Sequence, residues 1–80
     1  MTFNGTTATI KATKPEDYKE NTATLRVCDG KGNLVKETKV TYQNGIASCD
    51  VIGLKSGETY LFVFTDGKLD LSANYIVKCP

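Results

Sequence analysis

The sequence has no histidine and no tryptophan, and it contains one methionine. Without histidine it lacks the commonest general base and the commonest metal ligand of proteins. Ten Lys and Arg residues nearly cancel nine Asp and Glu residues, so the net charge is +1. That balance gives no electrostatic footprint for nucleic acid or an anionic membrane, and no apolar run approaches the ~20 residues of a membrane-spanning helix. We therefore expect no nucleic-acid partner, no membrane partner and no cofactor.

The length limits the chain to one small domain. A chain of 80 residues buries about 60% of its unfolded surface, which sustains one core and leaves no room for a cleft between two domains. We expect a single domain over residues 1–80, with the polar residues 1–5 as its one candidate for a flexible segment. Met1 is followed by polar residues and not by the apolar region of a signal peptide.

The abundant residue types favour strands. Thr, Val, Ile, Phe and Tyr make up 28 of the 80 residues, and these types fit a pleated, half-buried surface. Alternation of apolar and polar residues predicts six strands, over residues 6–13, 22–29, 34–42, 46–52, 60–65 and 69–79. Turn signals separate them, namely the charged segment 14–21 with Pro15, the pair Gly30 and Gly32, Asn44-Gly45, and Asp66-Gly67.

Three of these runs carry further information. The fifth run is apolar on both faces, which is typical of a central, buried strand. The register of the fourth run is open by one residue, and we place its uniformly apolar set (Ala47, Cys49 and Val51) on the core face. In the third run Lys36 and Thr38 share the nominally apolar face, which predicts a bulge or a sheet edge.

Short strands at regular spacing, separated by turn signals, predict an all-β fold. Our interpretation is an antiparallel β-sandwich of six to seven strands. The alternative is a closed up-and-down barrel, whose interior would be filled by side chains.

The segment before the fifth run resembles a known family. Leu54, Gly57, Thr59 and Tyr60 stand at the spacings of the turn before the sixth strand of fibronectin type III domains. Residues 27–35 and 44–47 are similar to bacterial immunoglobulin-like repeats, and the resemblance covers about residues 22–65. It implies an immunoglobulin-like, fibronectin type III-like sandwich in which Leu54, Gly57 and Tyr60 are structural. In that family the tyrosine hydroxyl folds back onto the turn backbone, as the tyrosine corner.

The three cysteines are Cys28, Cys49 and Cys79, an odd number without a C-x-x-C spacing. If the strands alternate up and down, Cys28 and Cys79 fall at the same end of the molecule. A disulfide there would close a loop of about 50 residues and stabilise by about 4 kcal/mol. The alternative is three reduced thiols, with Cys49 a buried small hydrophobe. A catalytic cysteine is not expected, because no imidazole exists to activate it.

Acidic residues offer two weak alternatives. The carboxylates of segment 16–20 lie in one predicted loop, but glycosidase chemistry needs two carboxylates that converge in a cleft. Asp29, Asn33 and Asp66 are the candidate ligands for calcium if they meet at one loop end.

Tyrosines are the remaining candidates for contact with a ligand. Tyr60 and the two phenylalanines that follow it in alternation belong to the predicted core. Tyr18 stands in a charged loop, and we expect Tyr42 or Tyr75 to face solvent. Exposed tyrosines give contact area to sugars or proteins at small entropic cost.

These observations favour a non-enzymatic structural or interaction module with a protein partner or self-association. Such a module serves assembly or adhesion, for example in a phage virion or on a bacterial surface, and we expect a virion or extracellular location. One alternative is a carbohydrate-binding module that uses Tyr18, Tyr42 or Tyr75 as stacking platforms. The other is a small protein inhibitor that presents the loop 15–21 or an edge strand.

Overall fold

A computed structural model describes residues 1–71 and 75–80, which form strands and turns. The strands are β1 (Thr2–Asn4), β2 (Thr7–Thr13), β3 (Thr22–Asp29), β4 (Leu34–Thr41), β5 (Ile46–Val51), β6 (Thr59–Thr65) and β7 (Tyr75–Lys78). Within those residues no helix is long and apolar enough to cross a membrane.

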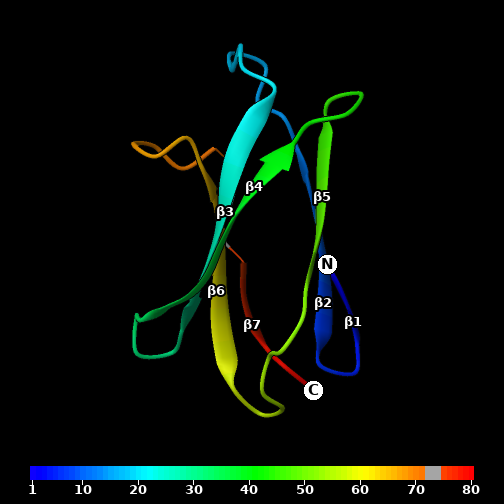
Figure 1. The fold of residues 1–80 in the computed structure, drawn as a ribbon, viewed down its shortest axis with the longest axis vertical. Helices are drawn as coiled ribbons and strands as arrows, with labels where there is room; N and C mark the ends of the chain where they lie inside the picture. The colour runs from blue at the N-terminus through cyan, green and yellow to red at the C-terminus, as the bar shows by residue number, and fades with distance from the viewer. Residues whose placement is uncertain (72–74) are drawn as a thin grey trace.

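The strands form two antiparallel sheets that lie face to face as separate layers (Figure 1). One sheet has the order β1-β2-β5 and the other the order β4-β3-β6-β7. The prediction of an all-β antiparallel fold is confirmed. Each sheet ends in edge strands, so the closed barrel is wrong.

Alternation along each strand sends one set of side chains between the sheets. The inner set includes the largest fully buried side chains: Phe62, Phe64, Ile10, Leu25, Val27, Val51 and Cys79. In β5, Ala47 and Val51 are buried and Cys49 packs partly against the core. The register chosen for that strand is therefore confirmed.

The first strand is shorter than the alternation signal can detect. Residues 1–5 were the candidate for a flexible segment, and within them Thr2 pairs with Thr9 and Phe3 pairs with Ala8. Gly5 has a φ of 62°, a left-handed conformation that suits glycine and lets the chain reverse between β1 and β2. Since the Phe3 side chain also packs against the core, residues 2–4 form part of the packed sheet.

The last predicted strand is shorter than residues 69–79. Only Tyr75–Lys78 form β7, while Asp70 makes an isolated bridge with Thr65. Residues 72–74 of that prediction lie outside the described residues.

β4 is an edge strand, as Lys36 and Thr38 on its inner face predicted. Its pairing with β3 also shifts register between Val27 and Cys28, which leaves Val35 as the extra residue. The side chains of Lys36 and Thr38 are only half-buried, because an edge strand leaves one side of each residue open to water.

Two leucines of this sheet test the assignment of faces. Leu25 is fully buried, whereas Leu34 is 46% exposed on the outer face. We expect Leu25→Ala to lower the free energy of unfolding by about 2–5 kcal/mol, because it opens a cavity in the core. Leu34→Ala removes the same atoms at the surface and should cost less than about 1 kcal/mol. Urea denaturation measures both, and equal losses would contradict the inner and outer faces described above.

Candidate functional site

A row of apolar side chains crosses the outer face of the four-stranded sheet. Cys28 on β3 pairs with Leu34 on β4 and with Leu61 on β6, and Leu61 pairs with Ile76 on β7. Directly paired residues of antiparallel strands share a face, so the four side chains line up across all four strands. We call these residues, Leu34, Cys28, Leu61 and Ile76, the outer apolar row.

The outer apolar row is most exposed at its two ends. Leu34 is 46% exposed and Ile76 is 72% exposed, while Cys28 and Leu61 between them are half-buried. A hollow of about 290 Å³ opens beside Leu61 and Ile76. A second, of about 200 Å³, lies between Cys28 and Val63 on the other side of the row. The row is therefore an apolar centre with shallow depressions on both sides.

Charged residues lie on both sides of this apolar centre, Arg26 and Asp70 at one hollow and Asp29 at the other. Next to the row, Arg26 and Glu37 form an ion pair with 3.1 Å between Nε and Oε2. Both side chains are about half exposed, so the pair adds little to stability. An apolar centre with a polar rim is the usual arrangement of a protein-binding surface.

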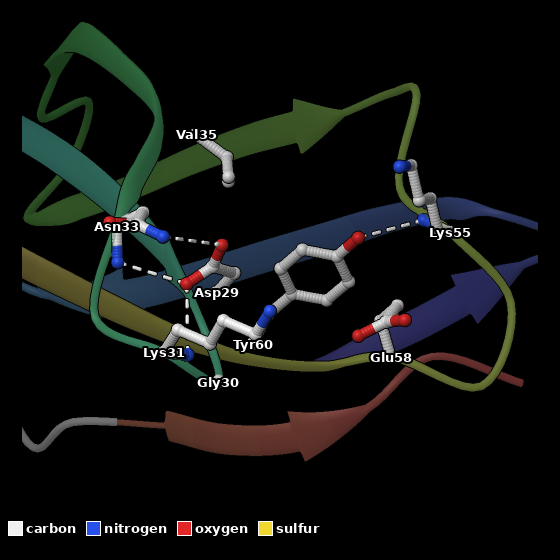
Figure 2. A pocket seen from close by; sticks show the side chains of 8 residues that line it. All are labelled: Asp29, Gly30, Lys31, Asn33, Val35, Lys55, Glu58 and Tyr60. Atoms are coloured by element: carbon white, nitrogen blue, oxygen red, sulfur yellow. Dashed lines mark hydrogen bonds between the residues drawn. The ribbon is translucent and has the colours of Figure 1, made fainter.

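A larger hollow lies at the end of the sandwich, where the β3–β4 hairpin meets the β5–β6 turn (Figure 2). It measures about 330 Å³ and is lined by Asp29, Gly30, Lys31, Asn33, Val35, Lys55, Glu58 and Tyr60. Both charge signs are present, but Arg26–Glu37 is the one ion pair among the residues that the structure describes. The hollow therefore offers polar walls without a concentrated charge of either sign.

Asp29 holds the hairpin together. Its Oδ1 accepts hydrogen bonds from the backbone N–H groups of Lys31 and Asn33, each at 2.9 Å. The bond from the Asn33 N–H, above all, lowers the pKa of the Asp29 carboxyl below its ordinary value. Asp29 is thus an ionised structural acceptor at neutral pH and not a proton donor.

Tyr60 fixes the turn on the other side of the hollow. Its buried hydroxyl accepts a hydrogen bond of 2.8 Å from the Lys55 N–H (Figure 2). Leu54 is buried in the same turn, and Gly57 has a φ of 84°, which a side chain would strain. The three residues that the resemblance makes structural therefore lie within one short turn.

The three candidate tyrosines do not form a common platform. Tyr42 is 6% exposed, so the expectation that it faces solvent is wrong. Tyr18 packs edge-on against it, with 6.1 Å between ring centroids, and its hydroxyl donates to the Thr22 carbonyl at 2.5 Å. Tyr75 packs partly against the core from the inner face of β7. The Tyr18–Tyr42 pair closes one end of the sandwich instead of presenting a stacking surface.

The predicted bridge between Cys28 and Cys79 is absent, and all three cysteines are free thiols. Cys28 lies on the outer face of its sheet, next to Leu61, whereas Cys79 is buried at 1% exposure on the inner face. The backbone of the sheet therefore stands between the two thiols. Cys49 is only partly buried, contrary to expectation, and desolvation raises the pKa of its thiol.

The calcium hypothesis is also wrong in its geometry. Asp29 pairs with Tyr60 at the start of β6, whereas Asp66 follows the end of that strand. Asp66 follows Tyr60 by six residues of extended chain, so Asp29 and Asp66 are about 20 Å apart along the strand direction. Within residues 1–71 and 75–80 no three His, Cys, Asp or Glu side chains converge as a metal site.

Sequence reasoning missed the outer apolar row. The apolar residues on both faces of the fifth run were visible, but they were assigned to burial alone. Only the pairing register shows that Leu61 has apolar neighbours on both sides.

Comparison of the chain with models of protein families, with curated proteins and with solved structures finds no significant match. The function must therefore be argued from the geometry above.

Two tyrosine hydroxyls should have opposite effects on stability. Tyr60→Phe removes the acceptor of a part-buried hydrogen bond from the Lys55 N–H, so we expect a loss of about 1 kcal/mol. The Tyr42 hydroxyl is buried without a hydrogen-bond partner among the described residues, so Tyr42→Phe should be neutral or stabilise by about 1 kcal/mol. Thermal and urea denaturation measure both variants. Equal destabilisation by the two would contradict the contacts described here.

The role of Asp29 predicts a pH dependence. Since its folded pKa lies below the ordinary 3.8, its contribution to stability is present above that value and is lost as the pH falls through the lowered pKa. Asp29→Ala should therefore be less stable than wild type at neutral pH, and the difference should shrink in strong acid. Urea titrations across this pH range test it. Asp17→Ala is the control, because Asp17 makes no hydrogen bond with the described residues.

Proposed function

We propose that this chain is a non-enzymatic, immunoglobulin-like interaction module of the fibronectin type III kind. It binds a protein partner through the outer apolar row of its four-stranded sheet.

The strand order supports the immunoglobulin-like assignment. Lettered in chain order as A, B, C, C′, E, F and G, the sheets become A-B-E and C′-C-F-G. Immunoglobulin-like sandwiches likewise place strands B and E opposite strands C, F and G. The Tyr60 hydroxyl, bonded to the backbone five residues upstream at the start of β6, has the geometry of a tyrosine corner.

The observation that carries the proposed function is the outer apolar row. Soluble domains expose single apolar residues everywhere, but a contiguous apolar strip with a polar rim marks an interaction surface. Here Leu34, Cys28, Leu61 and Ile76 are neighbours in register across four strands. A partner that covers the row removes the exposed ends of Leu34 and Ile76 from water.

A protein partner fits this surface better than a sugar. Sugar-binding surfaces use exposed aromatic rings, and the row contains none. The tyrosines that were candidates for stacking pack against each other or against the core.

The loop 15–21, which the inhibitor alternative would present, is held by hydrogen bonds at its end. The Tyr42 N–H donates to the Asn21 carbonyl at 2.7 Å, and Lys14 Nζ donates to Asn21 Oδ1 at 3.2 Å.

Site-specific crosslinking tests the proposed function. A photoreactive residue in place of Leu34 should crosslink a specific protein in the native host. The same residue in place of Ser48, which is exposed on β5 in the other sheet, should not.

The identified partner must then bind the purified chain. Leu34→Lys should weaken that binding by roughly tenfold or more, while Ser48→Lys leaves it unchanged. Equal crosslinking from both positions, no crosslinking from either, or binding that ignores Leu34→Lys would overturn the proposal. Tyr18-dependent binding to a glycan array would replace it with the carbohydrate alternative.

A further inference from the structure

The free edge of β7 differs from the other sheet edges. Each sheet has two edge strands, which gives β1, β5, β4 and β7. An edge strand presents unpaired backbone groups that can pair with another chain, and proteins usually protect such edges with charge, bulges or short length. The direction of backbone hydrogen bonding alternates from residue to residue along a strand. One known hydrogen bond in each pair of strands therefore shows which backbone groups of the edge strand are unpaired.

At β7 the alternation leaves Ile76 open. The Cys79 N–H donates to the Glu58 carbonyl at 2.8 Å, so Cys79 turns toward β6. Val77 and Tyr75 turn the same way, and Ile76 and Lys78 therefore direct their N–H and C=O groups away from β6. In the described part of the chain no strand pairs with that side.

The other edges are protected. On β4 the Asp29 N–H bond to the Asn33 carbonyl fixes the direction, and the open positions include Leu34 before the register shift and Glu37 and Lys39 after it. On β5 the Lys14 N–H bond to the Gly45 carbonyl leaves Ser48 and Asp50 open.

β4 also carries the register shift, and β1 has three residues. β7 is thus the edge at which a regular stretch presents an open backbone together with an exposed apolar side chain, that of Ile76 at 72%.

We propose that two copies of the chain pair antiparallel through β7, with Ile76 opposite the Ile76 of the second copy. This register joins the N–H and C=O groups of the two Ile76 residues in a reciprocal pair of hydrogen bonds. It is also self-complementary, as the interface of a two-fold dimer must be. Tyr75 of each copy then lies opposite Val77 of the other.

The same register continues the outer apolar row from one copy into the next. Residues paired directly opposite share a face, so the two Ile76 side chains meet on the outer face. The dimer then presents one row twice as long, across a continuous sheet. The inference rests on the edge of β7 and stands or falls independently of the protein partner proposed above.

The net charge of the chain and the small size of the interface set the expected strength of the dimer. At a net charge of +1, two copies repel each other little. The four residues of β7 cannot supply the roughly 800 Å² per partner of a standard interface. We therefore expect a weak, reversible dimer with a dissociation constant in roughly the micromolar to millimolar range.

Sedimentation velocity and light scattering over a concentration series, with reductant present, test the dimer. The weight-average mass of the wild type should rise from 8.7 kDa toward twice that value. Ile76→Lys places like charges directly opposite each other across the two-fold axis, so it should raise the dissociation constant by at least about tenfold. Ile52→Lys is the matched control, because Ile52 is 68% exposed but lies outside β7, and it should associate like the wild type.

Further measurements locate the contact and control for folding. The Ile76 amide should exchange with solvent more slowly as concentration rises, because dimerisation pairs it. Thermal melts of dilute samples show whether Ile76→Lys folds, and Ile76→Thr replaces it if it does not. A wild type that stays monomeric throughout overturns the proposal. So does equal dissociation of the Ile52 variant, or association that leaves the Ile76 amide unprotected.

Discussion

β3 and β6 lie side by side in the middle of the four-stranded sheet, with Val27 opposite Phe62 and Leu25 opposite Phe64. These four side chains are fully buried, and burial of aromatic and branched residues is the largest favourable term in a domain of this size. The pairing that fills the core also places Cys28 opposite Leu61 on the other face. The register of one strand pair therefore determines both the packed interior and the apolar surface, because a shift by one residue would exchange the two faces.

The end of the sandwich near the large hollow depends on this pairing in a different way. Asp29 is the last residue of β3 and Tyr60 lies opposite it in β6. Each turns a polar group to backbone N–H groups in its own neighbouring turn. Backbone N–H groups of these turns have no partner strand, and side chains from the central strands accept their hydrogen bonds instead. The polar residues that line the hollow thus include groups already committed to holding the turns.

Local sequence patterns predicted much of this fold. Alternation located most of the strands, and Asn44-Gly45 marked a hairpin in which both residues have positive φ. Lys36 and Thr38 indicated an edge because a charge on an apolar face is tolerated only where water reaches it.

The errors concern relations between distant strands. The Cys28–Cys79 bridge and the calcium site both depended on which end and which face each residue occupies. Alternation along residues 22–29 already placed Cys28 on the same face as Arg26 and on the opposite face from Val27. That was a signal against the bridge. The burial of Tyr42 did have a local signal, because alternation places it on the same face as Val40, and both are buried. The contact with Tyr18, from a loop 24 residues earlier in the chain, had none.

Cys79 connects the last strand to the turn before β6. Its N–H and C=O groups bond Glu58 and Gly57, and its thiol is 1% exposed. A reagent in solution can reach that sulfur only after the C-terminal segment detaches from the turn. The rate at which Cys79 is alkylated under native conditions therefore reports the local opening of this part of the sheet, and the mass of the peptide that contains Cys79 measures it.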